Sequence, residues 1–268
     1  MLTYLYLDYG GLPNYRQELK YSLISLRQEL RGEAQIAVYS DAPEAYRNWP
    51  VTAVGIAGRL AAWSGGGLYQ RRIKPEVVKD ALARFAGPVC VLAAGSIVRP
   101  GFHAEVTGKM EGAVVLHAFE RSNPYPPLSG FRCRLPHLGG YRYDVGNSVM
   151  YNSGLIGMRP EHAPLLDDVL AMIDALIGRA KKFPAMEQFA LSEVLRLGQI
   201  PVAEVRNSFL HYWQGRRRIY MANQIERSLS PDWDDLTPPK QWADMNIWAI
   251  RAYNYYYGIT NMFSGWSK

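Results

Sequence analysis

The chain has 268 residues, of which 48% are hydrophobic and 20% are charged, and its formal net charge is +6. This length and composition are typical of a folded globular protein and exclude a disordered chain. With only Cys90 and Cys133 present, we expect no disulfide framework and a protein of the reducing cytoplasm. No apolar run approaches the ~20 residues that span a bilayer, and no basic segment precedes the first strand-like residues, so neither a transmembrane helix nor a signal peptide is expected.

The first hundred residues alternate between strand and helix patterns. Apolar runs predict strands at residues 2–7, 35–39, 51–56 and 89–93. Leucines between Leu19 and Leu30 recur at intervals of four, three and four, which places them on one helical face. A second helix is predicted around Pro75, which suits a first helical turn. This alternation predicts an α/β fold with a mostly parallel, Rossmann-like central sheet flanked by helices.

The middle of the chain predicts fewer regular elements. Strands are expected at residues 112–117 and 150–158, and helices at residues 163–180 and 185–197. Residues 121–140 are rich in proline, glycine and aromatic side chains, and we expect them to form a long loop. Loops of that length inside a compact domain are usually lids or binding loops.

The composition changes near the C-terminal end. We expect one domain over residues 1–228, and residues 229–268 to form a linker and an aromatic-rich extension. The aromatic segment 246–268 has two interpretations, a peripheral membrane contact or a tail that packs on the domain or on a partner. We favour the second, because Arg251 and Lys268 are its only basic residues and interfacial segments usually carry more.

Polar residues follow two neighbouring predicted strands at the edge where open α/β sheets bind ligands. Asp8 and Tyr9 follow the first strand and Asp41 follows the second. The carboxylates suit a base edge or a ribose hydroxyl, and the tyrosine suits stacking, although Asp41 also suits a turn before Pro43. Basic residues gather at residues 71–74 and 216–218, either as solvated surface or as a field that attracts phosphates.

The predicted strand at residues 150–158 contains Asn152, Ser153 and Gly154, and about thirty residues later Glu187 and Gln188 open a predicted helix. Glycine inside a strand commonly marks the close approach of another group. This combination, in this order, resembles the second half of GT-A-fold glycosyltransferases. The resemblance is nearest to the branch of glycogenin, galactinol synthase and bacterial lipooligosaccharide galactosyltransferases, and it covers residues 2–220.

The resemblance implies a hexosyl- or pentosyltransferase that uses a nucleotide-sugar donor. Sugar-binding residues would be Asn152, Ser153 and Gly154, and catalytic residues would be Glu187, Gln188 and Asn152. Residues around the nucleotide would be Asp8, Tyr9, Asp41, Arg72, Lys74, Ser96, His211 and Arg216. The acceptor stays open between a glycan, a lipid, a protein and a nucleic acid. Other histidines, His117 among them, show no metal-ligand spacing.

The sequence departs from the family at its metal-binding Asp-x-Asp motif. Alignment by the flanking residues places Ala93 and Gly95 at the two carboxylate positions, and neither side chain can bind a hard cation. We therefore expect no cofactor, because Ala93 and Gly95 disfavour Mn²⁺ or Mg²⁺, and we expect basic residues to offset the diphosphate charge. Two alternatives stay open: a catalytically inactive GT-A scaffold that serves as a binding or assembly module, and a transferase that modifies nucleic acid.

Overall fold

The computed structural model describes residues 1–122, 128–179, 185–213 and 215–243, without the side chain of Arg216. Its central sheet has seven strands in the order β10 (Val202–Glu204), β6 (Val114–Ser122), β9 (Val149–Met158), β4 (Val89–Leu92), β1 (Thr3–Asp8), β2 (Gln35–Ser40) and β3 (Thr52–Gly55). Strand β9 runs antiparallel to both of its neighbours, and the other described pairings of this sheet are parallel. The predicted α/β class with a mostly parallel sheet is confirmed.

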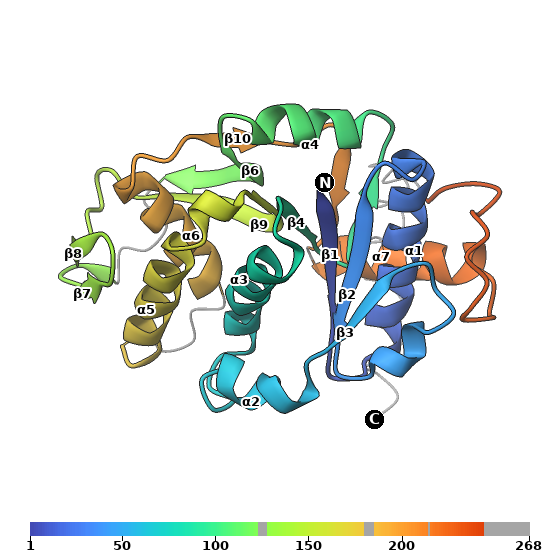
Figure 1. Cartoon of the computed structure of the whole chain (residues 1–268), viewed down its shortest axis with the longest axis horizontal. Helices are drawn as coiled ribbons and strands as arrows, with labels where there is room; N and C mark the ends of the chain where they lie inside the picture. The colour runs from blue at the N-terminus through green and yellow to red at the C-terminus, as the bar shows by residue number, and fades with distance from the viewer. Residues whose placement is uncertain (123–127, 180–184, 214, 244–268) are drawn as a thin grey trace, which may run out of the picture.

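Seven α-helices accompany the sheet: α1 (Pro13–Leu30), α2 (Leu60–Trp63), α3 (Ile73–Phe85), α4 (Phe102–Met110), α5 (Leu165–Ile177), α6 (Met186–Leu197) and α7 (Gly215–Ser228) in the part of the chain that the structure describes. Helices α3, α5 and α6 cover one face of the sheet, and α1 and α4 cover the other (Figure 1). Helix α7 packs against α1.

Alternating side chains of β1 supply both hydrophobic cores. Leu5 and Leu7 pack in the core beneath α3, α5 and α6, whereas Tyr4 and Tyr6 pack in the core beneath α1 and α4. Successive side chains of a strand point to opposite faces, so a strand buried on both faces is apolar throughout. Helix α1 begins with Pro13 and ends before Arg31, whose φ of 46° is left-handed, a common way to terminate a helix.

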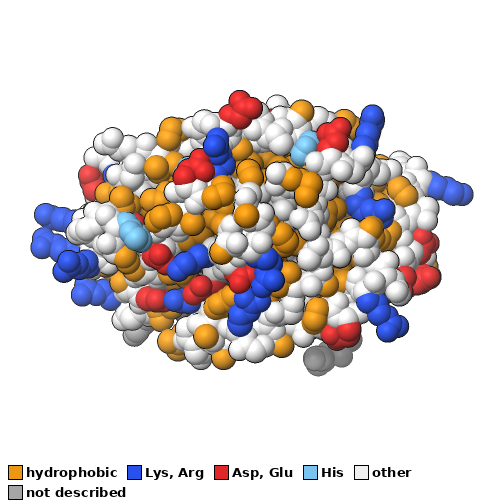
Figure 2. Space-filling model, in the orientation of Figure 1, with side chains coloured by type: hydrophobic (Ala, Val, Ile, Leu, Met, Phe, Trp, Pro, Cys, Tyr) orange, Lys and Arg blue, Asp and Glu red, His pale blue; other side chains and the backbone are white. Residues whose placement is uncertain are grey.

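The expected loop at residues 121–140 is wrong over much of its length. Strand β6 continues to Ser122, and β7 (Arg132–Leu135) and β8 (Gly139–Arg142) form an antiparallel hairpin. Its arginines Arg132, Arg134 and Arg142 are exposed, while Leu135 and Tyr141 are buried. The charged outer residues hid the strand pattern. Basic side chains gather at this end of the molecule (Figure 2).

Residues 229–243 lie against the domain rather than extending from it as a spacer. The indole nitrogen of Trp233 donates to the carbonyl of Ala45 at 2.8 Å, and its ring lies 4.5 Å from that of Trp49. The ammonium of Lys20 donates to the carbonyls of Ser230 and Asp232. The aromatic segment 246–268 lies outside the described residues. Among the helices that the structure describes, none combines the length and apolarity needed to cross a membrane.

The order of the strands reverses beside β1. The chain passes from β1 to β2 and β3 on one side, then returns as β4 on the other side of β1. Ligands of open α/β sheets bind at such a reversal, outside the carboxyl ends of the strands. Strand β9 extends past the end of β4, since the amide of Ala93 donates to the carbonyl of Gly154 at 2.8 Å. Residues 149–154 therefore lie at the edge where sheets of this kind usually bind ligands.

Candidate functional site

The site is centred on Ser153, where β9 meets the first turns of α3 and α6. The ammonium of Lys74 donates to the carbonyl and hydroxyl oxygens of Ser153 at 3.2 and 3.1 Å. The same ammonium lies 3.7 Å from Oε1 of Glu187, to which the Ser153 hydroxyl donates at 3.4 Å. The backbone amide of Ser153 donates to Oε1 of Gln188 at 3.1 Å. The structure thus brings together residues separated by more than one hundred positions in the sequence.

Helices α3 and α6 contribute to the site from their first turns. Lys74 lies in the first turn of α3, and Glu187 and Gln188 lie in the first turn of α6. A carboxylate is favoured there because the partial charge at a helix N-terminus is positive. Glu187 is nevertheless buried, and a buried carboxylate is stable only when it is paired or hydrogen-bonded. Lys74, Ser153 and Tyr69 meet that requirement.

Tyr69 is a member of the site that sequence reasoning missed. Its hydroxyl donates a short hydrogen bond to Oε2 of Glu187 and accepts one from the Glu187 amide at 3.3 Å. Burial and the neighbouring carboxylate raise the pKa of Tyr69, so the phenol stays protonated. No strand or helix pattern marks Tyr69 in the sequence, because it directly precedes a short 3-10 turn, Gln70–Arg72.

Lys74 and Arg71 both bring positive charge close to Glu187 and Tyr69. Burial lowers the pKa of Lys74, against an opposing contribution from Glu187, and the charge of Arg71 lowers it further. Arg71 also acts on the pKa values of Tyr9 and Tyr69. Its side chain is exposed, and it adds a second cation near the partly exposed ammonium of Lys74.

A second carboxylate, Glu120, connects Asn152 to Gln188. Its Oε1 accepts from the side-chain amide of Asn152, and its Oε2 accepts from the side-chain amide of Gln188, each at 2.6 Å. The register of β6 against β9 shifts between Phe119 and Arg121, and such a bulge redirects a side chain. Sequence reasoning missed Glu120 because it expected that strand to end at residue 117.

Two histidines meet on the other end of the Asn152 side chain. Oδ1 of Asn152 accepts from the Gly154 amide at 2.8 Å and lies 3.0 Å from Nδ1 of His211 and 3.3 Å from Nδ1 of His117. The two rings stand edge to face at 5.4 Å. Burial, followed by the charges of His117, Lys74 and Arg218, holds the pKa of His211 well below its usual value. His211 is therefore neutral and donates through Nδ1.

The imidazole of His211 occupies the space above Gly154. A Cβ at Gly154 would lie 2.1 Å from Nδ1 of His211 and 2.8 Å from Oδ1 of Asn152. The sequence predicts a close approach at this glycine, and the approaching group is a side chain of the protein itself. His211 reaches it from β11 (Phe209–His211), which pairs antiparallel with β5 (Ser96–Val98).

Asp8, Tyr9 and Asp41 lie together at the carboxyl ends of β1 and β2. Oδ2 of Asp8 accepts from the hydroxyl of Tyr46 at 2.7 Å and from Nε of Arg16 at 3.1 Å. Oδ1 of Asp8 is buried without a hydrogen-bond partner among the described residues. Asp41 accepts from the amide of Gly10 at 2.8 Å, and the hydroxyl of Tyr9 donates to the carbonyl of Gln70 at 3.2 Å.

Two predicted nucleotide-binding residues, Arg72 and Ser96, make their described side-chain contacts outside this network. Arg72 donates to Asp174 and Glu76, each at 2.7 Å, and so ties α3 to α5. Ser96 is buried and donates to the carbonyl of Ala93 at 2.6 Å. The side chain of Arg216 lies outside the described residues. Its neighbour Arg218 forms a bidentate ion pair with the buried Glu18, with contacts of 2.9 and 2.6 Å.

The segment aligned with the family's metal motif does not fit a divalent ion. Ala93 and Gly95 offer no side-chain oxygen, and Oε2 of Glu18, near Gly95, is already paired with Arg218. His211 lies opposite Ser96 in the β5–β11 ladder, but its Nδ1 is engaged by Asn152. Across the described residues, no cluster of three or more His, Cys, Asp or Glu side chains is placed to hold a metal ion.

A scan against models of known protein families gives no match, and a search of curated proteins gives none either. The fold and the geometry define an α/β protein with a buried polar network at the edge of the sheet where proteins of this class usually bind ligands.

Proposed function

We propose that the protein is a glycosyltransferase that uses a nucleotide-sugar donor. The observation that carries the proposal is the convergence of Lys74, Ser153, Glu187 and Gln188 beside the strand-order reversal. Ligand sites of α/β sheets combine such a reversal of strand order with a few convergent polar groups. The resemblance of the Asn152–Gly154 strand and the Glu187–Gln188 helix start to GT-A-fold enzymes supports the same activity.

In this proposal each part of the network has a chemical role. Asp8, Tyr9 and Asp41 lie where the nucleoside binds, while Lys74 and Arg71 offset the charge of the diphosphate. Glu187 lies nearest the transferred sugar, as a general base, a nucleophile or a partner of a sugar hydroxyl. Asn152 and Gln188, oriented by Glu120, bind the sugar. We leave the stereochemical course open.

We further propose that transfer needs no divalent ion. Positive groups that are preorganised where charge develops can stabilise a leaving diphosphate without a metal. Lys74 is held in place by two bonds to Ser153, and it is such a group.

Calorimetric titration with a panel of nucleoside diphosphates and their sugars, with and without manganese, tests the donor site. We expect at least one nucleotide to bind, and Lys74→Met to weaken its binding by about 10- to 100-fold, the range for losing a hydrogen bond to a charged group. Lys79→Met is the matched control, because Lys79 lies on the same helix and pairs with Asp167 away from the site. Absence of binding by every member refutes the proposal.

A second candidate is a catalytically inactive scaffold that binds a nucleotide or a partner. The observation that favours it is the loss of both carboxylates at Ala93 and Gly95, together with the mutual pairing of Lys74 and Glu187. Nucleotide binding without donor hydrolysis or transfer would establish this candidate in place of the enzyme.

A further inference from the structure

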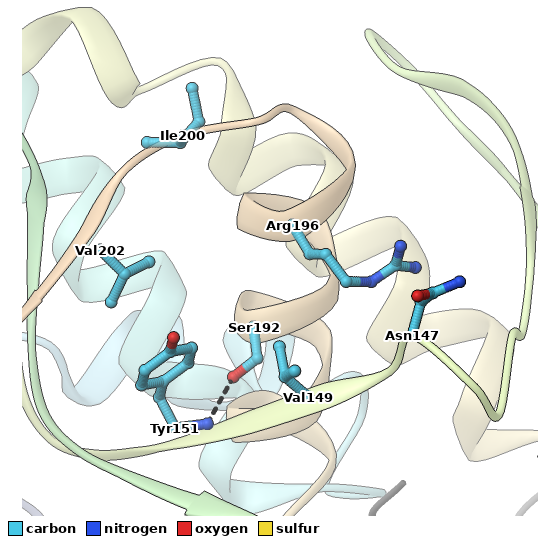
Figure 3. Close-up of a pocket in the computed structure, with 7 residues that line it drawn as sticks. All are labelled: Asn147, Val149, Tyr151, Ser192, Arg196, Ile200 and Val202. Carbon is cyan, nitrogen blue, oxygen red and sulfur yellow. Dashed lines mark hydrogen bonds between the residues drawn. The ribbon is translucent and has the colours of Figure 1, made fainter. Parts of the chain in front are cut away.

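A cleft of about 460 Å³ opens beside the site, between β9, α6 and the chain that leads into β10 (Figure 3). It is lined by Asn147, Val149, Tyr151, Ser192, Arg196, Ile200 and Val202. Small-molecule sites in proteins usually measure about 300–1,000 Å³. The cleft is therefore large enough for a small ligand.

Hydrogen bonds connect the cleft to the polar network. The amide of Tyr151 donates to the hydroxyl of Ser192 at 2.9 Å, and that hydroxyl donates to the carbonyl of Gln188 at 2.8 Å. Tyr151 and Ser153 are two residues apart on β9, so their side chains share one face of the strand at a spacing of about 7 Å. A ligand at the Tyr151 side of the cleft would therefore lie next to the part of β9 that carries Ser153.

The walls of the cleft differ in chemistry. Ile200, Val202 and the ring of Tyr151 form one side, while Arg196 and Asn147 lie across from them (Figure 3). Arg196 is fixed by bonds of 3.0 and 2.9 Å to the fully buried Glu193. The side-chain nitrogen of Asn147 donates to the carboxylate of Asp144 at 2.7 Å, and this bond holds the Asn147 side chain in place. Both polar groups are thus preorganised.

We propose that this cleft binds a saccharide and is the acceptor subsite of the enzyme. A pyranose ring has an apolar C–H face that packs on an aromatic wall, and hydroxyl groups at its rim that bond to amide and guanidinium groups. A nucleotide fits less well, because Glu193 offsets the charge of the one guanidinium that lines the cleft, whereas a neutral hydroxyl needs only an N–H donor. Saccharide binding rests on the geometry of the cleft, and the acceptor role rests on the proposed function.

The test measures binding of the full chain to an array of labelled oligosaccharides and monosaccharides, with nucleoside diphosphate binding by the wild type measured in parallel. We expect at least one saccharide to bind and Tyr151→Ala to weaken it roughly tenfold, as expected for losing an aromatic contact. Val202→Trp should abolish binding by filling the cleft. Ala203→Trp is the matched control, because it places the same ring on the opposite face of β10.

Two results overturn the proposal: no saccharide on the array binds, or binding is unchanged in both Tyr151→Ala and Val202→Trp. Unfolding midpoints of the variants identify any loss that reflects misfolding, and Tyr151→Phe, which keeps the ring, should retain binding. If the protein binds a saccharide through the cleft but binds no nucleotide, the saccharide site is upheld. The acceptor role is then refuted, together with the proposed transferase activity. Nucleotide binding without saccharide binding refutes the subsite alone.

Discussion

At the scale of single residues, Gly154 and His211 determine the shape of the site. A side chain at position 154 would collide with the imidazole of His211. The imidazole is hydrogen-bonded to the same Asn152 oxygen that accepts from the Gly154 backbone amide. The sequence predicts the small residue and the histidine separately. Their contact depends on the β5–β11 ladder, a pairing of short strands that local pattern cannot reveal.

Gly154→Ala should destabilise the protein. The new methyl group would lie 2.1 Å from the His211 ring, and overpacking of this kind costs about 1–3 kcal/mol. Urea unfolding measures the loss. Gly108→Ala is the control, since nothing lies within 4 Å of its Cβ position on α4, and it should be neutral or stabilising. In a protein that already carries His211→Ala, the ring is absent, so Gly154→Ala should destabilise the fold less than it does in the wild type. Equal effects of Gly154→Ala with and without the ring would contradict the contact.

Glu187→Gln should abolish most of the proposed transfer activity while the protein stays folded. The amide has the shape of the carboxylate but cannot act as a base or nucleophile, and such groups contribute about two to four orders of magnitude in rate. Turnover of the donor identified by calorimetry measures the loss. Glu111→Gln, at an exposed position that ends α4, is the control. Undiminished turnover would remove Glu187 from the catalytic machinery.

At the scale of elements, strands and helices with clear periodicity were predictable, and elements that depend on tertiary context were not. Strand β9 and helix α6 appear where their apolar patterns indicate. The β7–β8 hairpin was missed because exposed arginines alternate with inward residues over only four positions. Glu120 and Tyr69 were missed for a related reason, since a β-bulge and a 3-10 turn place them.

The junction of β6, β9 and β11 should make stability depend on pH. Burial lowers the pKa values of His117 and His211 in the folded state, so the unfolded chain binds more protons below its histidine pKa of about 6.5. Stability is therefore retained above about pH 6.5 and lost as the pH falls. Urea unfolding should show that the free energy of unfolding declines between pH 7.5 and 5.5. His211→Gln should make this slope shallower by up to about 1.4 kcal/mol per pH unit. Identical slopes would show that His211 does not titrate on unfolding.

The contact between α3 and α5 gives Arg72 a structural role. Its guanidinium bonds both oxygens of Asp174, at 2.7 and 3.0 Å. A double-mutant cycle with Arg72→Ala and Asp174→Ala should give a coupling free energy of about 0.5–1 kcal/mol, because Asp174 is half exposed and solvent screens the pair. A coupling of zero, combined with loss of nucleotide binding in Arg72→Ala alone, would return Arg72 to the donor site.

At the scale of the whole molecule, the strand-order reversal positions the entire site. It leaves the carboxyl ends of β1 and β2 on one side of the reversal and the extended half of β9 on the other. The α/β alternation predicts this arrangement in outline. It does not predict that β9 is antiparallel, which is what carries Asn152 and Ser153 past the end of β4 and into reach of Lys74.

Donor hydrolysis in the presence of a chelator tests the central claim most directly. The nucleotide sugar that binds in calorimetry is incubated with the protein in EDTA, and release of free sugar and nucleoside diphosphate is measured. We predict that the wild type releases both products at a rate that added manganese leaves nearly unchanged. Glu187→Gln should lose this release. Release that requires manganese would contradict the metal-independent site at Ala93 and Gly95. No release under any condition, despite nucleotide binding, would contradict the enzyme itself.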